Sequence, residues 1–211
     1  MNRVQITEGV CGYVLSGGAS SRFGADKGQT ELGGRTLLER TCTLVAESAG
    51  SVTVVAPTGR YKSLNVRTIS ESCPGHGPLG GIIGALTDAQ ERAHSHTWCL
   101  VVGCDMPFLT RPWLSHLCEL ARESRAQVLV PRSENGLEPL CACWNTLAAS
   151  QLQNGFAAGV RKVTEAMKSV GVEVLEESAW KRFDADGRLF WNMNTPADYQ
   201  EAKRIVDAER P

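Results

Sequence analysis

The chain has 211 residues, of which 42% are hydrophobic and 21% are charged, and its formal net charge is −1. This composition is ordinary for a globular protein, and a net charge near zero gives no reason to expect the concentrated basic face that binds nucleic acid. No apolar run approaches the length of a membrane span. We therefore expect a single well-buried domain over residues 1–211, with neither nucleic acid nor a membrane as a partner.

The start of the chain and its cysteines both indicate a cytoplasmic protein. Residues 1–15 (MNRVQITEGVCGYVL) begin with a polar lead and continue as a strand-like run, without the charged, apolar and small-residue order of a signal peptide. Eight cysteines are present but form no C-x-x-C pair, which disfavours a disulfide or metal scaffold. We expect buried free thiols that act as small hydrophobic side chains.

Short apolar runs predict the strands. The run TWCLVVG (residues 97–103) is almost continuously apolar, which is typical of a central parallel strand buried on both faces. Asn135-Gly136 is a turn signal, so the run PLCACW (residues 139–144) is expected to return as a strand beside its predecessor. The expected strands are residues 10–16, 51–56, 66–69, 97–103, 127–130, 139–144 and 172–175.

Amphipathic segments between these runs predict helices. Thr36 and Glu39 form a capping box at the start of one helix, and Thr195 with Pro196 marks the start of the last. The strand–helix alternation predicts an α/β protein, a three-layer α/β/α sandwich with a mostly parallel sheet. The expected helices begin at residues 36, 78 and 195, span residues 112–123 and lie around residues 160–167.

The segment LSGGASSRFGADKG (residues 15–28) follows the first strand, where open parallel sheets bind ligands. Gly17 and Gly18 can adopt backbone angles closed to other residues, so their amides can face an anion. Arg22 offers a planar fork to phosphate oxygens, and Lys27 offers a point charge. The segment matches neither the Walker A nor the dinucleotide-binding pattern. It predicts a phosphate cradle, and the alternative is a flexible surface turn.

Asp105 stands at the carboxyl end of the buried run, followed by Met106 and Pro107. A lone carboxylate in this position can hold Mg²⁺, which takes one or two carboxylates while phosphates and water supply the other ligands. The alternative is a turn-forming or helix-capping aspartate, which is common before proline. A triphosphate with one magnesium ion needs this pairing of a cradle and a carboxylate.

Four motifs, spread in order over almost the whole chain, resemble those of the molybdenum cofactor guanylyltransferases (MobA), within the wider group of MobA-like nucleotidyltransferases. The family opens with L-A-G-G-x-S-x-R-M-G-x-D-K and continues with G-P-L-x-G, C-D-x-P and N-x-N-T-P. The matching segments are LSGGASSRFGADK (15–27), GPLGG (77–81), CDMP (104–107) and NMNTP (192–196).

The resemblance implies a Rossmann-like nucleotidyltransferase fold. It also implies transfer of GMP from Mg-GTP to the terminal phosphate of molybdopterin, or of its molybdenum-bearing form, with release of pyrophosphate. The labile product suggests molybdoenzyme-loading proteins as partners. The residues implied are, for catalysis, Arg22, Lys27 and Asp105; for the nucleotide, Leu15, Ser16, Gly17, Gly18, Lys27, Glu71, Gly80 and Asp105; for the metal, Asp105 and Asn194; and for the acceptor, Glu138, Pro139, Asn192 and Asn194.

Two departures from the family pattern concern the nucleotide. Ala56 stands where the family often has an asparagine, and Glu71 replaces an aspartate. One alternative is a molybdenum cofactor cytidylyltransferase, whose motifs more often read L-A-A-G, G-D-x-P and D-x-D-T-P, or else another small-molecule nucleotidyltransferase. Another is a non-catalytic nucleotide-binding partner protein on the same fold. The presence of Lys27, Asp105 and both asparagines of the N-x-N-T-P motif speaks against the non-catalytic alternative.

Overall fold

The computed structural model describes residues 9–17, 26–61, 65–71, 77–92 and 98–209. Of the residues expected in the functional site, Gly18 and Arg22 lie outside this part of the chain. The main sheet contains the strands β1 (Val10–Leu15), β4 (Thr53–Val55), β5 (Arg67–Ile69), β6 (Trp98–Gly103), β7 (Val128–Ser133), β8 (Gly136–Leu137), β9 (Cys141–Asn145) and β10 (Val172–Leu175).

The strand order in this sheet is β10-β7-β9-β6-β1-β4-β5, with β8 paired to β7. β1 is parallel to β4 and β6, β4 is parallel to β5, and β7 is parallel to β10. β9 is antiparallel to both of its neighbours, β6 and β7. The predicted mostly parallel sheet is confirmed, and so is the prediction that the strand after Asn135-Gly136 returns beside its predecessor.

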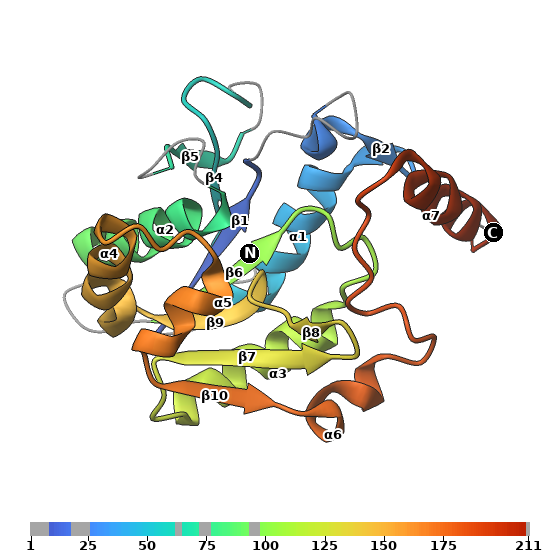
Figure 1. Ribbon diagram of the computed structural model, residues 1–211. Helices are drawn as coiled ribbons and strands as arrows, with labels where there is room; N and C mark the ends of the chain where they lie inside the picture. The colour runs from blue at the N-terminus through green and yellow to red at the C-terminus, as the bar shows by residue number, and fades with distance from the viewer. Residues whose placement is uncertain (1–8, 18–25, 62–64, 72–76, 93–97, 210–211) are drawn as a thin grey trace, which may run out of the picture.

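Helices cover both faces of the sheet (Figure 1). α1 (Leu37–Ala49) and α3 (Arg111–Glu123) pack on one face, and α2 (Pro78–Arg92), α4 (Ala149–Ala157) and α5 (Val163–Ala166) pack on the other. Each face contributes its own apolar cluster, so the sheet is buried on both sides, as parallel strands require. The predicted three-layer α/β/α architecture is confirmed.

Alternation along β1 shows how the strand serves both layers. Val14 belongs to the cluster with α1 and α3, whereas Tyr13 and Leu15 belong to the cluster with α2. Gly12 allows α1 to approach closely, because a Cβ atom at this position would meet Cγ1 of Val45. The first strand is therefore packed between two helical layers, and this packing fixes the position of its carboxyl end, from which the next segment begins.

The structure differs from the sequence-based expectation between residues 149 and 169. One helix was expected around residues 160–167, but the structure has α4, then the short α5, then a 3-10 turn (Met167–Ser169). α4 has only nine residues and contains Asn154 and Gly155, which are poor helix formers, so its local helix signal is weak. This helix is stabilised by packing against α2, which no local pattern reveals.

The C-terminal part of the chain passes through α6 (Glu177–Trp180) and ends in α7 (Pro196–Ala208). α7 packs beside β2 (Glu31–Leu32), which forms a small hairpin with β3 (Arg35–Thr36). Thr195 caps α7 as predicted, with Pro196 in its first turn.

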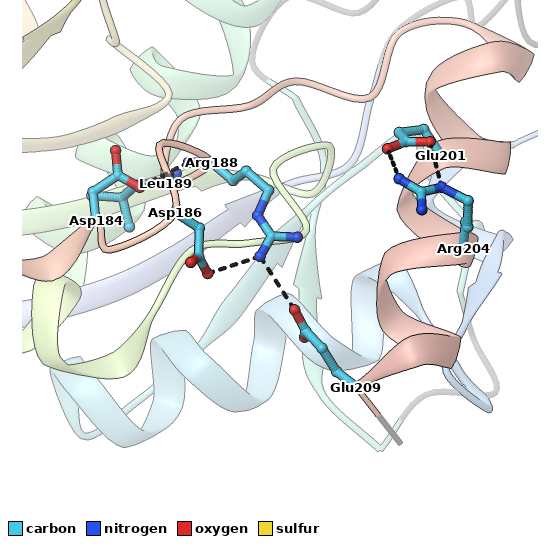
Figure 2. A network of polar contacts seen from close by, with 7 residues as sticks. All are labelled: Asp184, Asp186, Arg188, Leu189, Glu201, Arg204 and Glu209. Carbon is cyan, nitrogen blue, oxygen red and sulfur yellow. Dashed lines mark hydrogen bonds and ion pairs between the residues drawn. The ribbon is translucent and has the colours of Figure 1, made fainter. Parts of the chain in front are cut away.

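Arg188 anchors the segment that leads into α7. Its Nη2 atom lies 2.8 Å from Oδ2 of Asp186 and 3.2 Å from Oε1 of Glu209, as Figure 2 shows. The carboxylate of Asp184 accepts a hydrogen bond of 2.8 Å from the backbone N of Arg188. These contacts tie the segment to the end of α7, and they hold the N-x-N-T-P motif in a defined place.

The cysteines of the described residues are free thiols. Seven cysteines of the described chain are free thiols, and all of them except Cys11 are buried, which confirms the expectation for those positions. The eighth cysteine, Cys73, lies outside the described residues. In the described part of the chain, no helix has the length and apolar character needed to cross a bilayer.

Candidate functional site

The ends of neighbouring strands meet at one edge of the sheet. Leu15, the last residue of β1, lies in register with Gly103, the last residue of β6. Gly17 and Asp105 each lie two residues beyond these paired strand ends, so both residues are at the same edge of the sheet. Because β9 runs antiparallel to β6, Glu138, which precedes β9, also comes to this edge. Open parallel sheets bind their ligands here.

Lys27 lies at the centre of this edge, in a short 3-10 helix (Lys27–Gln29) capped by Asp26. Its Nζ atom donates a hydrogen bond of 2.9 Å to Oδ1 of Asn194 and lies 3.7 Å from Oδ2 of Asp105. The side chains of Lys27 and Asp105 are 17% and 25% exposed, so solvent screens their attraction less than at the open surface. Three of the residues predicted from the sequence therefore converge.

The C-terminal segment is held directly against the segment that follows β6. The backbone N of Met193 donates a hydrogen bond of 2.8 Å to the carbonyl O of Asp105. The rings of Phe108 and Trp191 stack with their centroids 5.4 Å apart. The backbone hydrogen bond and the ring stack join the same two segments, so they fix the position of the C-terminal segment relative to Asp105.

The two asparagines of the motif differ in their contacts. Asn194 accepts the hydrogen bond from Lys27, and its backbone N donates to Asp198 at 2.7 Å. Asn192 donates from Nδ2 to the carbonyl O of Phe190 at 3.2 Å, within its own segment. The structure thus places the side chain of Asn194 against the lysine, and it uses the amide of Asn192 to shape the turn before it.

Gly17 and Glu71 are in direct contact. The carboxylate of Glu71 takes the position that a Cβ atom on Gly17 would occupy, so a larger residue at position 17 would displace it. Gly80 is buried in the first turn of α2. The adjacent Gly81 packs against Leu15, whose Cδ1 atom lies 3.1 Å from the position of a Cβ atom on Gly81. The glycines of the G-P-L-x-G motif therefore let α2 approach the end of β1.

Glu138 and Pro139 lie between β8 and β9. Glu138 is buried, and its Oε1 atom accepts a hydrogen bond of 2.6 Å from Oγ of Ser133. Burial raises the pKa of the Glu138 carboxyl, the hydrogen bond from Ser133 opposes this rise, and repulsion from the Asp105 carboxylate adds to it. The carbonyl O of Pro139 accepts a hydrogen bond of 3.2 Å from Nε1 of Trp144. Both residues therefore stand at the edge that carries Asp105.

Tyr61 was not expected at this edge, yet its hydroxyl group reaches two segments of the site. It donates to Oδ1 of Asp26 at 2.7 Å and lies 2.7 Å from Oγ of Ser16. Tyr61 lies in the turn after β4, five residues beyond Ala56. These contacts join residues that are 35 and 45 positions apart in the chain, so no local sequence signal could have revealed them.

Oxygen donors dominate the edge around Lys27. They are the carboxylates of Asp105 and Glu138 and the amide of Asn194, and hard oxygen ligands of this kind suit Mg²⁺. Across the residues that the structure describes, no group of three or more His, Cys, Asp or Glu side chains is arranged to hold a metal. Asp105 and Asn194 offer oxygen atoms of the kind that Mg²⁺ accepts, and an ion held by so few side chains would take its other ligands from phosphates and water.

A family model described as the MobA-like NTP transferase domain matches residues 12–172 of the chain. This range includes Gly17, Lys27, Asp105 and Glu138, and it ends before Asn194. Lys27, Asp105 and Glu138 thus belong to the matched domain. The asparagine that contacts the lysine is supplied by the C-terminal segment.

Named proteins resemble the chain over nearly its full length. It is 27% identical to the molybdenum cofactor guanylyltransferase of Desulfosudis oleivorans, with 96% of this chain and 98% of that protein covered. It is 31% identical to a probable molybdenum cofactor guanylyltransferase of Chloroflexus aggregans, with 89% and 90% covered. The crystal structure of molybdopterin-guanine dinucleotide biosynthesis protein A from Archaeoglobus fulgidus superposes with a TM-score of 0.79 at 26% identity, covering 94% of this chain and 99% of that chain. These similarities agree with the α/β nucleotidyltransferase fold expected from the motifs.

Proposed function

The chain belongs to the MobA-like NTP transferase family, and from this premise we propose that it transfers GMP from Mg-GTP to the terminal phosphate of molybdopterin or of its molybdenum-bearing form. An oxygen of the acceptor phosphate attacks the α-phosphorus of GTP. The bond from this phosphorus to the bridging oxygen of the β-phosphate breaks, and pyrophosphate leaves. The observation that carries this proposal is the convergence of Lys27, Asp105 and Asn194 at the carboxyl edge of the sheet.

The chemistry asks for positioning and charge stabilisation. A phosphate acceptor is ionised at neutral pH and is already a nucleophile, so it needs no strong general base. The ammonium group of Lys27, oriented by Asn194, neutralises negative charge as it builds on the phosphates. We assign Arg22 to the same phosphates, since it belongs to the same glycine-rich segment. Charge stabilisation by preorganised groups of this kind is usually the largest contribution to such a rate.

Asp105 and Asn194 are the residues that would hold the magnesium ion. When bound, Mg²⁺ neutralises charge on the phosphates and polarises the phosphoryl group under attack. In the free protein the Asp105 carboxylate faces Lys27 at 3.7 Å, so each charge has a partner before the nucleotide arrives. The lysine and the aspartate are thereby kept in place without being buried as isolated charges.

The nucleotide would lie along the end of β1 and the start of α2. We assign Leu15, Ser16, Gly17 and Gly18 to this surface, together with Gly80 at the start of α2. The carboxylate of Glu71, which rests on Gly17, accepts hydrogen bonds. Ribose hydroxyls and the N–H groups of guanine both donate them, so Glu71 suits either part of GTP.

The acceptor would enter from the side of Glu138, Pro139 and Asn192. The wall of a cavity of about 420 Å³ includes Ser133, the hydrogen-bond partner of Glu138, and Trp191, which precedes Asn192 in the chain. The same wall combines aromatic rings with carboxylates, which can stack on a pterin and accept from its N–H groups. Its aromatic and acidic residues include Glu134, Glu176, Trp180, Asp184, Phe190 and Trp191.

The cellular setting follows from the substrate. We propose that residues 1–211 act as one domain in the cytoplasm and that the product passes directly to molybdoenzyme-loading proteins, because a labile cofactor is protected by direct transfer. Pull-down of such a protein by the tagged chain, in the presence of GTP and molybdopterin, would support this. Failure to recover any loading protein under these conditions would count against it.

The first test is calorimetric titration of the chain with GTP, CTP, ATP and UTP, each with and without Mg²⁺. A clear Mg²⁺-dependent preference for GTP is expected, followed by pyrophosphate release when molybdopterin is added. A preference for CTP would identify a cytidylyltransferase instead. Binding of no nucleotide would favour the non-catalytic partner protein.

A further inference from the structure

Tyr61 occupies an unusual backbone position for its side chain. Its φ angle is +62°, and no other non-glycine residue in the described part of the chain has a positive φ. Bulky residues rarely adopt this conformation, and they keep it only where the surrounding structure imposes it. The Tyr61 side chain is 5% exposed, although it comes from a surface turn. The turn is therefore folded so that this side chain points inward.

The hydroxyl group of Tyr61 bonds to two polar side chains, those of Asp26 and Ser16, and through Ser16 it is linked to Cys104. It donates to Asp26 at 2.7 Å (Oδ1) and 2.9 Å (Oδ2), so its only proton is used there. Its oxygen then accepts from Oγ of Ser16 at 2.7 Å, and the Ser16 oxygen in turn accepts from Sγ of Cys104 at 3.6 Å. The result is a directed chain of hydrogen bonds from Cys104 through Ser16 and Tyr61 to the Asp26 carboxylate.

The Tyr61 hydroxyl group retains its proton at neutral pH. Burial raises the pKa of Tyr61, and the neighbouring Asp26 carboxylate adds to this rise. The hydrogen bond from Tyr61 to Asp26 therefore keeps its direction at neutral pH.

The two ends of this chain lie next to the two charges of the site. Asp26 immediately precedes Lys27, and Cys104 immediately precedes Asp105. Close packing supports the middle of the chain, because a Cβ atom on Gly28 would lie 2.5 Å from Oγ of Ser16 and 2.7 Å from the Tyr61 oxygen. Asp26 also accepts a hydrogen bond of 3.1 Å from the backbone N of Gly28, so its side chain caps the 3-10 helix that carries Lys27.

We propose that Tyr61 is a positioning residue for phosphoryl transfer, which uses the Cys104–Ser16–Tyr61–Asp26 chain to hold Lys27 in register with Asp105. The hydroxyl group touches no substrate and acts through Asp26 on the turn that carries Lys27. This role rests on the proposed function, in which Lys27 acts on the phosphates. Residues 18–25 lie between Ser16 and Lys27 in the sequence, and Tyr61 links the two ends of that segment directly.

The test is a double-mutant cycle of Tyr61→Phe with Lys27→Ala. The change to phenylalanine removes only the hydroxyl group. We expect it to lower kcat/KM for GTP about tenfold in the wild-type background, and by less than twofold in the Lys27→Ala background, since coupled residues lose their effect together. An unspecific structural role would give the same loss in both backgrounds. That result, or wild-type kcat/KM for Tyr61→Phe alone, would overturn the proposal.

Tyr13→Phe is the matched control. Tyr13 is also buried and also donates a hydrogen bond of 2.7 Å to a carboxylate, that of Asp88, but it lies within β1 away from the strand ends. This variant should be less stable than wild type and should retain its kcat/KM. If Tyr61→Phe fails to fold, Asp26→Asn weakens the same chain at its carboxylate end, and its effect on kcat/KM should likewise vanish when Lys27 is absent.

Dissociation constants for Mg-GTP separate the proposed function from the proposed role of Tyr61. They are measured on the wild type, Tyr61→Phe, Lys27→Ala and the double variant. If the wild-type chain binds Mg-GTP but transfers no GMP, the proposed function fails, while the cycle in the dissociation constant still tests the positioning role. If the wild-type chain transfers GMP and Tyr61→Phe changes neither kcat/KM nor the dissociation constant, the positioning role fails alone.

Discussion

The ammonium group of Lys27 donates a hydrogen bond of 2.9 Å to Oδ1 of Asn194, although 167 residues separate the two in the chain. The lysine comes from the glycine-rich segment after the first strand, and the asparagine comes from the segment before the last helix. The charged centre of the site is therefore complete only when the C-terminal segment docks on the sheet edge. This relationship makes the site sensitive to changes at either end of the chain.

Lys27→Ala should reduce the rate of GMP transfer by about 10²- to 10³-fold, because it removes a preorganised charge from the phosphates. The free energy of unfolding should change by about 1 kcal/mol or less, since the ion pair with Asp105 is long and partly exposed. The measurements are steady-state pyrophosphate release and thermal unfolding. Lys203→Ala, an exposed lysine on α7, is the control and should keep its full rate. A wild-type rate for Lys27→Ala would remove this residue from the mechanism.

Asp105→Asn should raise the Mg²⁺ concentration needed for half-maximal GTP binding by at least about tenfold, because a neutral amide is a weaker ligand for this ion than a carboxylate. Calorimetric titrations of GTP at a series of Mg²⁺ concentrations measure this directly. The exposed Asp207→Asn serves as the charge-matched control and should bind Mg-GTP normally. An unchanged Mg²⁺ requirement in Asp105→Asn would mean that another residue holds the metal.

Gly17→Ala should leave the fold intact but weaken GTP binding about tenfold or more. The added methyl group would take the place of the Glu71 carboxylate, which is the end of a flexible side chain and can swing away. Gly155→Ala is the control. It lies in α4 with no atom closer than 3.9 Å to the new methyl group, and should stabilise the protein by about 0.5–1 kcal/mol. Normal GTP affinity in Gly17→Ala would show that neither residue contributes to the nucleotide site.

Glu138→Gln should remove a pH dependence of stability. Burial raises the pKa of Glu138 above its ordinary value of 4.5. Between the ordinary pKa of 4.5, which applies to the unfolded chain, and the higher pKa of the folded chain, only the folded chain still holds the proton. The free energy of unfolding therefore falls as pH rises through this window. The variant cannot ionise and is spared this loss. Its melting temperature relative to wild type should therefore increase as pH rises from about 4 towards 7. A constant difference across this range would contradict the assignment.

Asp88→Asn should destabilise the fold without affecting the site. Asp88 accepts hydrogen bonds of 2.7 Å from Tyr13 and of 2.5 and 2.7 Å from Arg67, and these bonds lower its pKa although burial alone would raise it. The loss should be about 2 kcal/mol at neutral pH, the usual size for hydrogen bonds to a charged group.

The pH dependence of this loss has a definite sign. A lowered pKa stabilises the fold above the ordinary value of 3.8, and this stability disappears as pH falls through the lower, native value. Denaturant unfolding at neutral and acid pH should show the difference between wild type and Asp88→Asn shrinking in acid. A difference that stays constant would show that the charge of Asp88 does not matter.

Much of the local structure could be predicted from the sequence. The capping box of Thr36 and Glu39 and the Thr195-Pro196 start of α7 were both found where expected. The apolar run at residues 97–103 became the buried central strand β6. Such features depend on neighbouring residues, because caps satisfy nearby backbone groups and buried strands are uniformly apolar. The motifs for Lys27 and Asp105 were visible for the same reason, since each is a short continuous pattern.

Other features depended on contacts between distant segments. α4 was missed because it is short and contains the poor helix formers Asn154 and Gly155, and because the helix is stabilised by packing on α2. The insertion of β9 between β6 and β7 could not be read from its own residues either, and it is this insertion that brings Glu138 to the strand ends. Tyr61 has no motif, and it joins the site only because the turn after β4 folds back onto Asp26 and Ser16.

The amino-acid sequence by itself determined the alternation of strands and helices, the caps and the order of the motifs, because these are set by interactions over a few residues. The tertiary structure alone decided which motif residues meet, which asparagine contacts Lys27, and which additional side chains hold it in place. Hydrogen bonds between residues 45 or 167 positions apart need the whole sheet and its covering helices to bring their partners within reach.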